Sequence, residues 1–179
     1  MNKFYITGIA GTGKSTLVKE LEKRNIRAFD MDAVPELCHW KNKLTGKKAK
    51  YYSGIGRDWI EAHDWICDKD RLMELLDIEN KTIVVVAGIA SNHDEYLDLF
   101  DKVFLLHCPE EIFLHRLRTR EKNEFAKEKS EQEQVLSWYK DFEAKMLKKG
   151  AVSIDTESTI DVVADQVISQ IIHADQEND

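Results

Sequence analysis

The segment from Gly8 to Ser15 constrains the fold of this chain more than any other part of it. It reads Gly-Ile-Ala-Gly-Thr-Gly-Lys-Ser and fits the pattern G-x-x-x-x-G-K-[ST] without a mismatch. Glycines let successive backbone N–H groups turn inward around phosphate oxygens, and a helix that follows points its positive end at the same anion. The strand-like run at 3–7 and the helical spacing of apolar residues after Lys14 supply the flanking elements that such a loop needs.

The residue types of this loop predict its ligand. Lys14 is suited to bridge the β- and γ-phosphates of a nucleoside triphosphate, and the Ser15 hydroxyl is suited to ligate magnesium. A glycine-rich turn that matches by accident is the alternative, and the strand and helix expected on either side argue against it. We therefore predict ATP and Mg²⁺ as cofactors, with the phosphates held by Gly8, Gly11, Thr12, Gly13, Lys14 and Ser15.

Strands and helices are predicted to alternate through the rest of the chain. The β-branched run at 83–87 has no polar alternation, which is typical of a strand buried on both faces of a parallel sheet. The alternation predicts an α/β fold of the three-layer P-loop NTPase type, with about five parallel strands and helices on both faces. Further strands are predicted at 26–29, 103–107 and 152–154, helices at 58–79, 109–120, 135–146 and 160–172, and a polar tail at 174–179.

Length and charge limit the partners of the chain. Its 179 residues suit a single domain, 1–179. Because 33 acidic side chains outnumber 26 basic ones, for a net charge of -7, no nucleic acid or membrane partner is expected. Three isolated cysteines, no secretion signal and no apolar run of ~20 residues predict a cytoplasmic protein with a small-molecule partner. The oligomeric state stays open.

Two segments depart from the regular alternation. We interpret the segment at about 34–66 as an irregular insertion with a small hairpin, and the polar stretch at about 121–132 as a lid over the nucleotide or a plain surface loop. The aromatic residues of the insertion either stack against a ring-shaped substrate or form a local core. They are Trp40, Tyr51, Tyr52, Trp59 and Trp65.

Three classes of protein with this loop are excluded by motifs that the sequence lacks. GTPase switches need D-x-x-G and N-K-x-D, but the Asn-Lys pairs at 42–43 and 80–81 have Thr45 and Ile83 at the fourth position. Oligomeric ATPase motors carry an acidic pair where this chain has Gly88-Ile89. A transporter signature is missing as well.

Four short motifs follow the loop or the predicted strands. They are Thr16, Asp30-Met31-Asp32, Arg116 with Arg120, and Ile154-Asp155-Thr156. In this order they resemble the P-loop small-molecule kinases, the group of adenylate kinase, shikimate kinase and gluconate kinase. The second motif resembles the D-x-D of shikimate kinases, the third the R-x-x-x-R entry to an adenylate-kinase-type lid, and the fourth the adenine-side loop.

The resemblance implies roles for the residues nearest the phosphates. Thr16 would contact the α-phosphate, and Asp30 would hold magnesium together with Ser15. Asp32 would orient the attacking hydroxyl or accept its proton. The alternative for either aspartate is that it N-caps the short helix expected near Ala33.

The resemblance also assigns the two arginines. Arg116 would lie against the adenine ring, and Arg120 would neutralise charge on the transferring phosphoryl group. Four residues apart, the two share one helix face. A solvated cationic helix end is the alternative for both.

The sequence departs from the monophosphate kinases after the strand at 83–87. Those enzymes place an aspartate near the end of this strand and an arginine just after it, whereas this chain has Gly88-Ile89-Ala90-Ser91-Asn92. Without that arginine, a neutral hydroxylated acceptor such as a nucleoside, a sugar acid or a similar metabolite is favoured over a monophosphate. The predicted acceptor-binding residues are Asp32, Arg57, Gly88 and Asn92.

Together these motifs predict an ATP-dependent kinase that transfers the γ-phosphoryl group to a hydroxyl of a small metabolite such as a nucleoside or a sugar acid. The predicted catalytic residues are Lys14, Asp32 and Arg120. A nucleotide-sensing ATPase or regulator and a monophosphate kinase are the alternatives. A nucleic-acid end kinase is a further one, and the net negative charge disfavours it.

Overall fold

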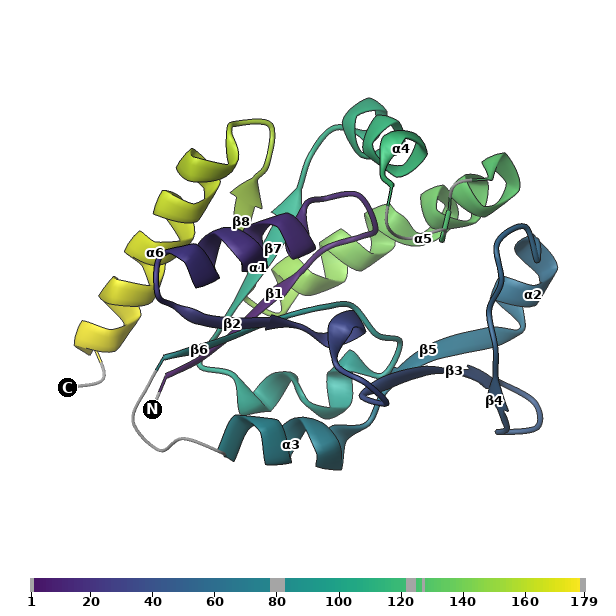
Figure 1. The fold of residues 1–179 in the computed structure, drawn as a ribbon, viewed down its shortest axis with the longest axis horizontal. Helices are drawn as coiled ribbons and strands as arrows, with labels where there is room; N and C mark the ends of the chain where they lie inside the picture. Colours follow the sequence, from purple (N-terminus) through teal and green to yellow (C-terminus); the bar gives the residue numbers. More distant parts are fainter. Residues whose placement is uncertain (1, 78–82, 122–124, 127, 178–179) are drawn as a thin grey trace.

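A five-stranded, all-parallel sheet forms the centre of the protein (Figure 1). The structure is a computed structural model that describes residues 2–77, 83–121, 125–126 and 128–177. The strand order is β2-β6-β1-β7-β8, and the predicted three-layer α/β fold is confirmed. The strands are β1 Lys3–Thr7, β2 Arg27–Asp30, β6 Val84–Ala87, β7 Lys102–His107 and β8 Val152–Asp155.

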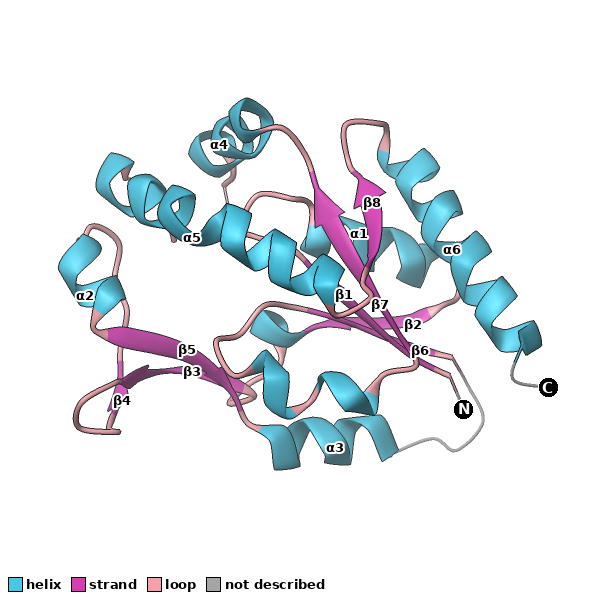
Figure 2. Cartoon of the chain, turned by 180° about the vertical axis from the view of Figure 1, so that it is seen from behind, coloured by secondary structure: helices cyan, strands magenta, loops and turns pink. Residues whose placement is uncertain are grey.

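Helices cover both faces of this sheet because successive side chains of a strand point to opposite faces. Phe4 and Ile6 pack against α1 and α6, whereas Tyr5 between them packs toward α3. On the same side as Tyr5, Leu105 of β7 packs against residues of α4 and α5. The view from behind shows α5 lying across this side of the sheet (Figure 2). These helices are α1 Lys14–Lys23, α3 Lys69–Asp77, α4 Glu110–Thr119, α5 Lys129–Lys148 and α6 Ile160–Glu177.

The insertion forms a second, smaller sheet beside the main one. Its strands are β3 Cys38–Asn42, β4 Lys48–Ala49 and β5 His63–Cys67, in the antiparallel order β4-β3-β5. The expected hairpin is β3–β4, and Gly46 in its turn has a φ of 68°, which an L side chain rarely adopts. The short helix α2 Arg57–Glu61 joins the hairpin to β5 and contacts α5.

The single helix predicted at 58–79 is wrong. Residues 57–77 instead form α2, β5 and α3 in succession. The reason is cross-strand pairing, since Cys67, Ile66 and Trp65 lie opposite residues of β3. Local helical spacing cannot detect a pairing with residues some 25 positions away.

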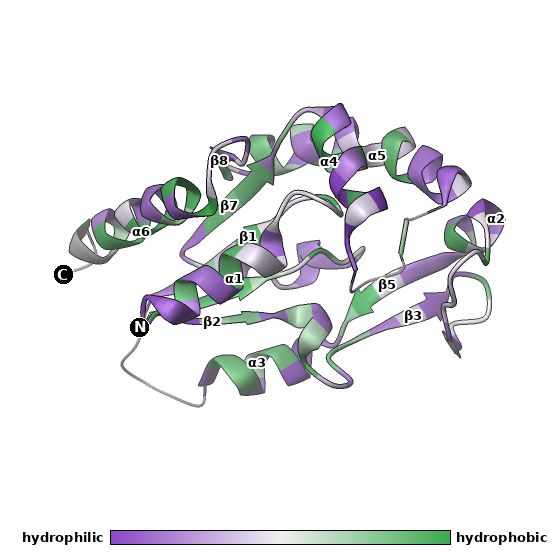
Figure 3. Cartoon of the chain, turned by 45° about the horizontal axis from the view of Figure 1, so that its top comes forward, coloured by the Kyte–Doolittle hydropathy of each residue, from purple (hydrophilic) through white to green (hydrophobic). Residues whose placement is uncertain are grey.

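The prediction of a polar tail at 174–179 is also wrong as far as residue 177, because α6 continues to that point. Ala174 is buried in the same cluster as Val163, Val167 and Ile171, so the apolar stripe of α6 runs past the predicted end. In Figure 3 this helix alternates between hydrophobic and hydrophilic colours, whereas β7 is largely hydrophobic. None of the helices in the described ranges has the length and apolar character needed to cross a bilayer.

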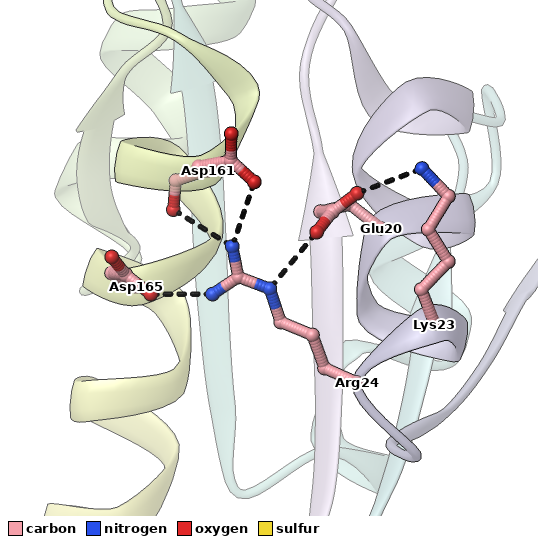
Figure 4. Close-up of polar contacts among 5 residues, drawn as sticks. All are labelled: Glu20, Lys23, Arg24, Asp161 and Asp165. Carbon is pink, nitrogen blue, oxygen red and sulfur yellow. Dashed lines mark hydrogen bonds and ion pairs between the residues drawn. The ribbon is translucent and has the colours of Figure 1, made fainter.

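An ion-pair network joins α1 to α6 (Figure 4). Arg24 follows α1, and its guanidinium contacts three carboxylates: Glu20 at 3.0 Å, Asp161 at 3.2 Å and Asp165. Glu20 also pairs with Lys23 at 3.0 Å. The two helices on this face are thereby connected by charge as well as by apolar packing.

Candidate active site

The loop from Gly8 to Ser15 connects β1 to α1, as the sequence predicts. The ammonium group of Lys14 donates to the carbonyl oxygens of Gly8 at 2.6 Å and Ile9 at 3.0 Å. Gly13 has a φ of 101°, and a Cβ placed on it would meet no atom within 4 Å. No side chain caps α1, and Gly13, Lys14 and Ser15 at its start line the cavity described below, so an anion there would meet the positive end of the helix.

Lys14 carries a perturbed pKa in this site. Burial lowers the pKa of its ammonium group from 10.5 to about 8, and the nearby Asp32 and Asp30 oppose the shift. The cause is desolvation of the charged form, which a bound polyphosphate would offset with its own negative charge. The two aspartates therefore do not fully offset the cost of burying the Lys14 cation, and a bound phosphate would supply the missing negative charge.

Ser15 and Asp30 provide oxygen ligands for a hard cation. The Ser15 hydroxyl donates to one carboxylate oxygen of Asp30, and the other accepts the backbone N–H of Asp32 at 3.0 Å. Asp30 is thus the N-cap of the 3-10 turn Met31–Ala33, as its alternative interpretation has it, and its role in holding magnesium stays a prediction. No group of three or more His, Cys, Asp or Glu side chains that could hold a metal ion occurs in the described ranges.

Asp32 faces the same cavity as Lys14. The indole N–H of Trp65, on β5, donates to its carboxylate at 3.1 Å. Burial and the neighbouring Asp30 raise the pKa of Asp32, while Lys14, the Trp65 hydrogen bond and Arg120 lower it. The Asp32 carboxylate therefore lies between Lys14 on the phosphate loop and Trp65 on the insertion, and it interacts with both.

Arg116 lies at the predicted adenine side of the loop. Its guanidinium donates to the Thr156 hydroxyl at 3.2 Å and the Thr156 carbonyl at 2.7 Å. Thr156 in turn donates to the carbonyl of His107 at 3.1 Å, which ties α4 to the ends of β7 and β8. The structure thus brings together Arg116 and Thr156, the two residues that the resemblance assigns to the adenine side.

Arg120 immediately follows α4 and lines the cavity opposite the loop. Its guanidinium donates to the carbonyl of Phe125, and its charge acts on both Lys14 and Asp32. This position suits a cation that neutralises a transferring phosphoryl group.

One cavity of 1650 Å³ joins these groups to the insertion. Thr12 and Gly8 shape the loop itself. The Thr12 hydroxyl donates to Ile9 O at 2.9 Å, and Gly8 packs so closely on β7 that a Cβ there would lie 2.5 Å from Leu106 O. The predicted residues that line the cavity are Gly11, Thr12, Gly13, Lys14, Ser15, Thr16, Asp32, Arg116, Arg120 and Thr156.

Five aromatic rings gather on the insertion side of the cavity. Trp40 lies at their centre, with ring centroids at 5.2 Å from Trp59, 5.4 Å from Trp65, 6.0 Å from Phe125 and 6.1 Å from Tyr51. All of them except Trp59 also line the cavity. The cluster therefore forms a local core of the insertion and also lines the cavity, while stacking on a substrate stays a prediction. Tyr52, which belongs to the same prediction, is exposed.

Three residues predicted to bind the acceptor do not line this cavity. Arg57 is exposed on α2 and pairs with Glu61 at 2.7 Å. Gly88 packs on Met31, since a Cβ there would lie 2.5 Å from the sulfur atom. Asn92 bonds to the backbone N–H and carbonyl of Cys67 at 3.0 and 2.9 Å, so its amide fixes the end of β5.

The sequence did not reveal the role of Glu131 or its contact with Tyr51. Glu131 falls within the predicted lid, yet it is fully buried in α5 and bonds to the Tyr51 hydroxyl. The sequence signal here was a polar stretch with one aromatic residue in it. Such a stretch does not predict that Glu131 is buried against Tyr51, a partner 80 residues away. The lid residues 122–124 and 127 lie outside the described residues, and 129–132 belong to α5.

The comparisons with known proteins agree with this geometry. A family model described as an AAA domain matches residues 5–136. No curated protein matches the sequence at a significant level. β6 is followed by Gly88 and Ile89, where an oligomeric motor carries an acidic pair.

Several solved structures have the same fold. A shikimate kinase from Acinetobacter baumannii in complex with shikimate is 17% identical, with 97% of this chain and 94% of that chain covered and a TM-score of 0.60. A deoxyadenosine kinase from M. mycoides with bound dATP is 16% identical, with 94% and 98% covered and a TM-score of 0.59. A gluconokinase from Sinorhizobium meliloti is 16% identical, with 96% and 92% covered and a TM-score of 0.55. The chain therefore belongs to the AAA domain family, and its fold is that of the P-loop small-molecule kinases.

Proposed function

We propose that this protein is an ATP-dependent kinase that transfers the γ-phosphoryl group to a hydroxyl of a small, uncharged metabolite. One observation carries the proposal. The carboxylate of Asp32 lies in the cavity that the phosphate loop shares with the insertion, held by the Trp65 indole. A protein that only binds or senses ATP has no need of a carboxylate between the nucleotide and a second binding wall.

The residues of the chain divide the reaction between them. The backbone of the loop and Lys14 bind the phosphates, and Arg116 and Thr156 line the adenine side of the site. Asp32 orients the acceptor hydroxyl and accepts its proton. Ser15 and Asp30 would hold Mg²⁺, which supplies charge neutralisation on the phosphate oxygens when it is bound. Arg120 stabilises the charge that spreads onto the transferring group.

The cations in the cavity support an uncharged acceptor. The two arginines that line it, Arg116 and Arg120, both lie on the nucleotide side. Of the lysines that line it outside the phosphate loop, Lys43 pairs with Asp64 at 3.7 Å and donates to the carbonyl of Glu61 at 2.7 Å. Lys50 and Lys145 are single point charges rather than planar forks. A phosphorylated or carboxylated acceptor normally requires a dedicated arginine fork. A nucleoside or a neutral sugar needs only hydrogen bonds and a ring-shaped wall.

The test compares Asp32→Asn with the wild type in a panel of nucleosides and neutral sugars, with sugar acids included as the charged comparison. Asp32→Asn should lower kcat at least about 100-fold, the usual scale for a lost acid–base group, while calorimetry shows an unchanged Kd for ATP. Asp70→Asn, an exposed carboxylate of α3, is the matched control and should behave like the wild type. If Asp32→Asn keeps its turnover, or if no acceptor stimulates ADP formation, a nucleotide sensor is the better description.

A further inference from the structure

Glu131 is a carboxylate with no exposed surface, and its partners come from two different parts of the chain. The hydroxyl of Tyr51, in the insertion, lies 3.0 and 2.9 Å from its two oxygens. The backbone N–H of Ala126 donates to it at 2.9 Å. Because a buried charge is costly without such partners, these bonds fix the insertion, the 125–126 turn and α5 relative to one another.

The 125–126 turn is held in a conformation that it would not adopt alone. Ala126 has a φ of 59°, in the left-handed region that residues with a Cβ rarely occupy. Glu131 binds its N–H, and the side-chain amide of Gln132 donates to its carbonyl at 3.1 Å. Backbone in this region persists only where its surroundings over-determine it. Glu131 and Gln132 therefore set the shape of the turn.

The same turn contacts the catalytic arginine and the insertion. The carbonyl of Phe125 accepts a hydrogen bond from Arg120. The ring of Phe125 lies 6.0 Å from Trp40 and 5.8 Å from Tyr51, centroid to centroid. The chain of contacts thus runs from the insertion through Tyr51 and Glu131 to the turn, and from the turn to Arg120. Figures 1 and 2 show α2 of the insertion beside α5, and the two helices contact each other.

We propose that Tyr51 and Glu131 are positioning residues for Arg120, so that the docked insertion places this arginine at the transferring phosphoryl group. The proposal rests on the kinase function proposed above. It assigns to the insertion a second task besides forming the wall of the acceptor site. Arg120 is then set for transfer by the part of the chain that receives the acceptor.

The test removes each bond with little change of shape. Tyr51→Phe keeps the ring and loses the hydroxyl, and Glu131→Gln keeps the volume and loses the charge. Tyr52→Phe and Glu133→Gln alter exposed neighbours of the same residue types and serve as matched controls. The readout is the Kd for ADP with Mg²⁺ and aluminium fluoride, which imitates the group in transfer, compared with the Kd for ADP alone. This measurement needs no acceptor.

Arg120→Ala should weaken binding of the fluoride complex at least about tenfold, with ADP binding changed far less. Tyr51→Phe and Glu131→Gln should produce part of the same loss. In the Arg120→Ala background they should add less than about twofold, because residues that act through one another are not additive. A purely structural role predicts additive losses, or equal losses for ADP and for the fluoride complex, and either result overturns the proposal.

The outcomes separate the two proposals. If the single and combined variants lose affinity for the fluoride complex as expected but the wild type phosphorylates no acceptor, the result contradicts the kinase function and supports the positioning role. A wild type that phosphorylates an acceptor while Tyr51→Phe leaves the affinity for the fluoride complex unchanged contradicts the positioning role alone. If Glu131→Gln melts well below the wild type, Tyr51→Phe decides the question, since its aromatic packing is retained.

Discussion

At the scale of single residues, opposing effects set the pKa of Asp32. Burial and Asp30 raise its pKa, and Lys14, Trp65 and Arg120 lower it. A carboxylate must be ionised to accept the proton of a hydroxyl. The proposed activity should therefore fall as the pH drops through a pKa that lies above the ordinary value of 3.8.

Trp65→Phe tests this balance. The substitution keeps an aromatic ring but removes the N–H that stabilises the ionised carboxylate, so the pKa of Asp32 should rise further. The acid limb of the pH profile of kcat/KM should move to higher pH. Trp59→Phe, in the same aromatic cluster but without a hydrogen bond to Asp32 among the described contacts, is the control. A limb that stays in place or moves to lower pH contradicts the assignment of Asp32 as the base.

The sequence predicts single residues well where their role depends on near neighbours. Lys14 and Ser15 follow from an eight-residue pattern, and both lie where it places them. Gly88 and Asn92 were assigned to the acceptor, but packing against Met31 and hydrogen bonds to Cys67 decide their roles. Contacts of that kind arise only after distant segments have folded together.

At the scale of secondary-structure elements, Arg24 connects α1 to α6. Its three carboxylate partners lie on both helices. Lys23 and Arg24 lower the pKa of Glu20 below the ordinary 4.5. The stabilisation from Glu20 is therefore complete above that value and is lost as the pH falls through the lowered pKa.

Arg24→Ala should lower the midpoint of thermal unfolding at pH 7, and the difference from the wild type should shrink below about pH 4.5 and in high salt. Lys23→Ala, whose side chain is 73% exposed and pairs with Glu20, should have the smaller effect. Thermal melts of the three proteins at pH 7 and pH 3 measure both differences. An equal deficit at the two pH values would indicate that Arg24 acts by packing of its stem rather than by charge.

Elements were predictable where hydrophobic periodicity is strong. All five strands of the main sheet lie within a residue or two of their predicted positions. β5 was missed because His63–Cys67 depends on β3 for its pairing, and the residues before it continue a helical spacing. The hairpin of the insertion was expected, but the three-stranded sheet that contains it was not.

At the scale of the whole molecule, the main sheet and the insertion face one cavity from two sides. Tyr51, Glu131 and Phe125 join the insertion to α5 and to the arginine at the end of α4. Occupation of one side should therefore favour occupation of the other, and such coupling is reciprocal.

Thermal melting with an ATP analogue and an acceptor measures this coupling. Each ligand alone at 100 times its Kd should stabilise the fold by about 2.7 kcal/mol. The pair should stabilise it by more than the sum of the two, because the first ligand fixes groups that the second also contacts. Stabilisation that equals the sum would show that the two sides bind independently.

The two ends of the insertion lie side by side at Cys38 and Cys67, and this has a further consequence. Cys38 and Cys67 lie opposite each other, and the N–H of Asp68 donates to the carbonyl of Leu37 at 2.8 Å. The segment thus departs and returns one strand spacing apart, roughly 5 Å. In evolutionary terms it is a cassette, since another segment of almost any length could begin and end at this point and leave β2 and α3 in place. Exchange of the segment would replace the wall that faces the acceptor and keep the phosphate loop. The new segment would also have to supply the contacts to Asp32 and Glu131 that Trp65 and Tyr51 make here.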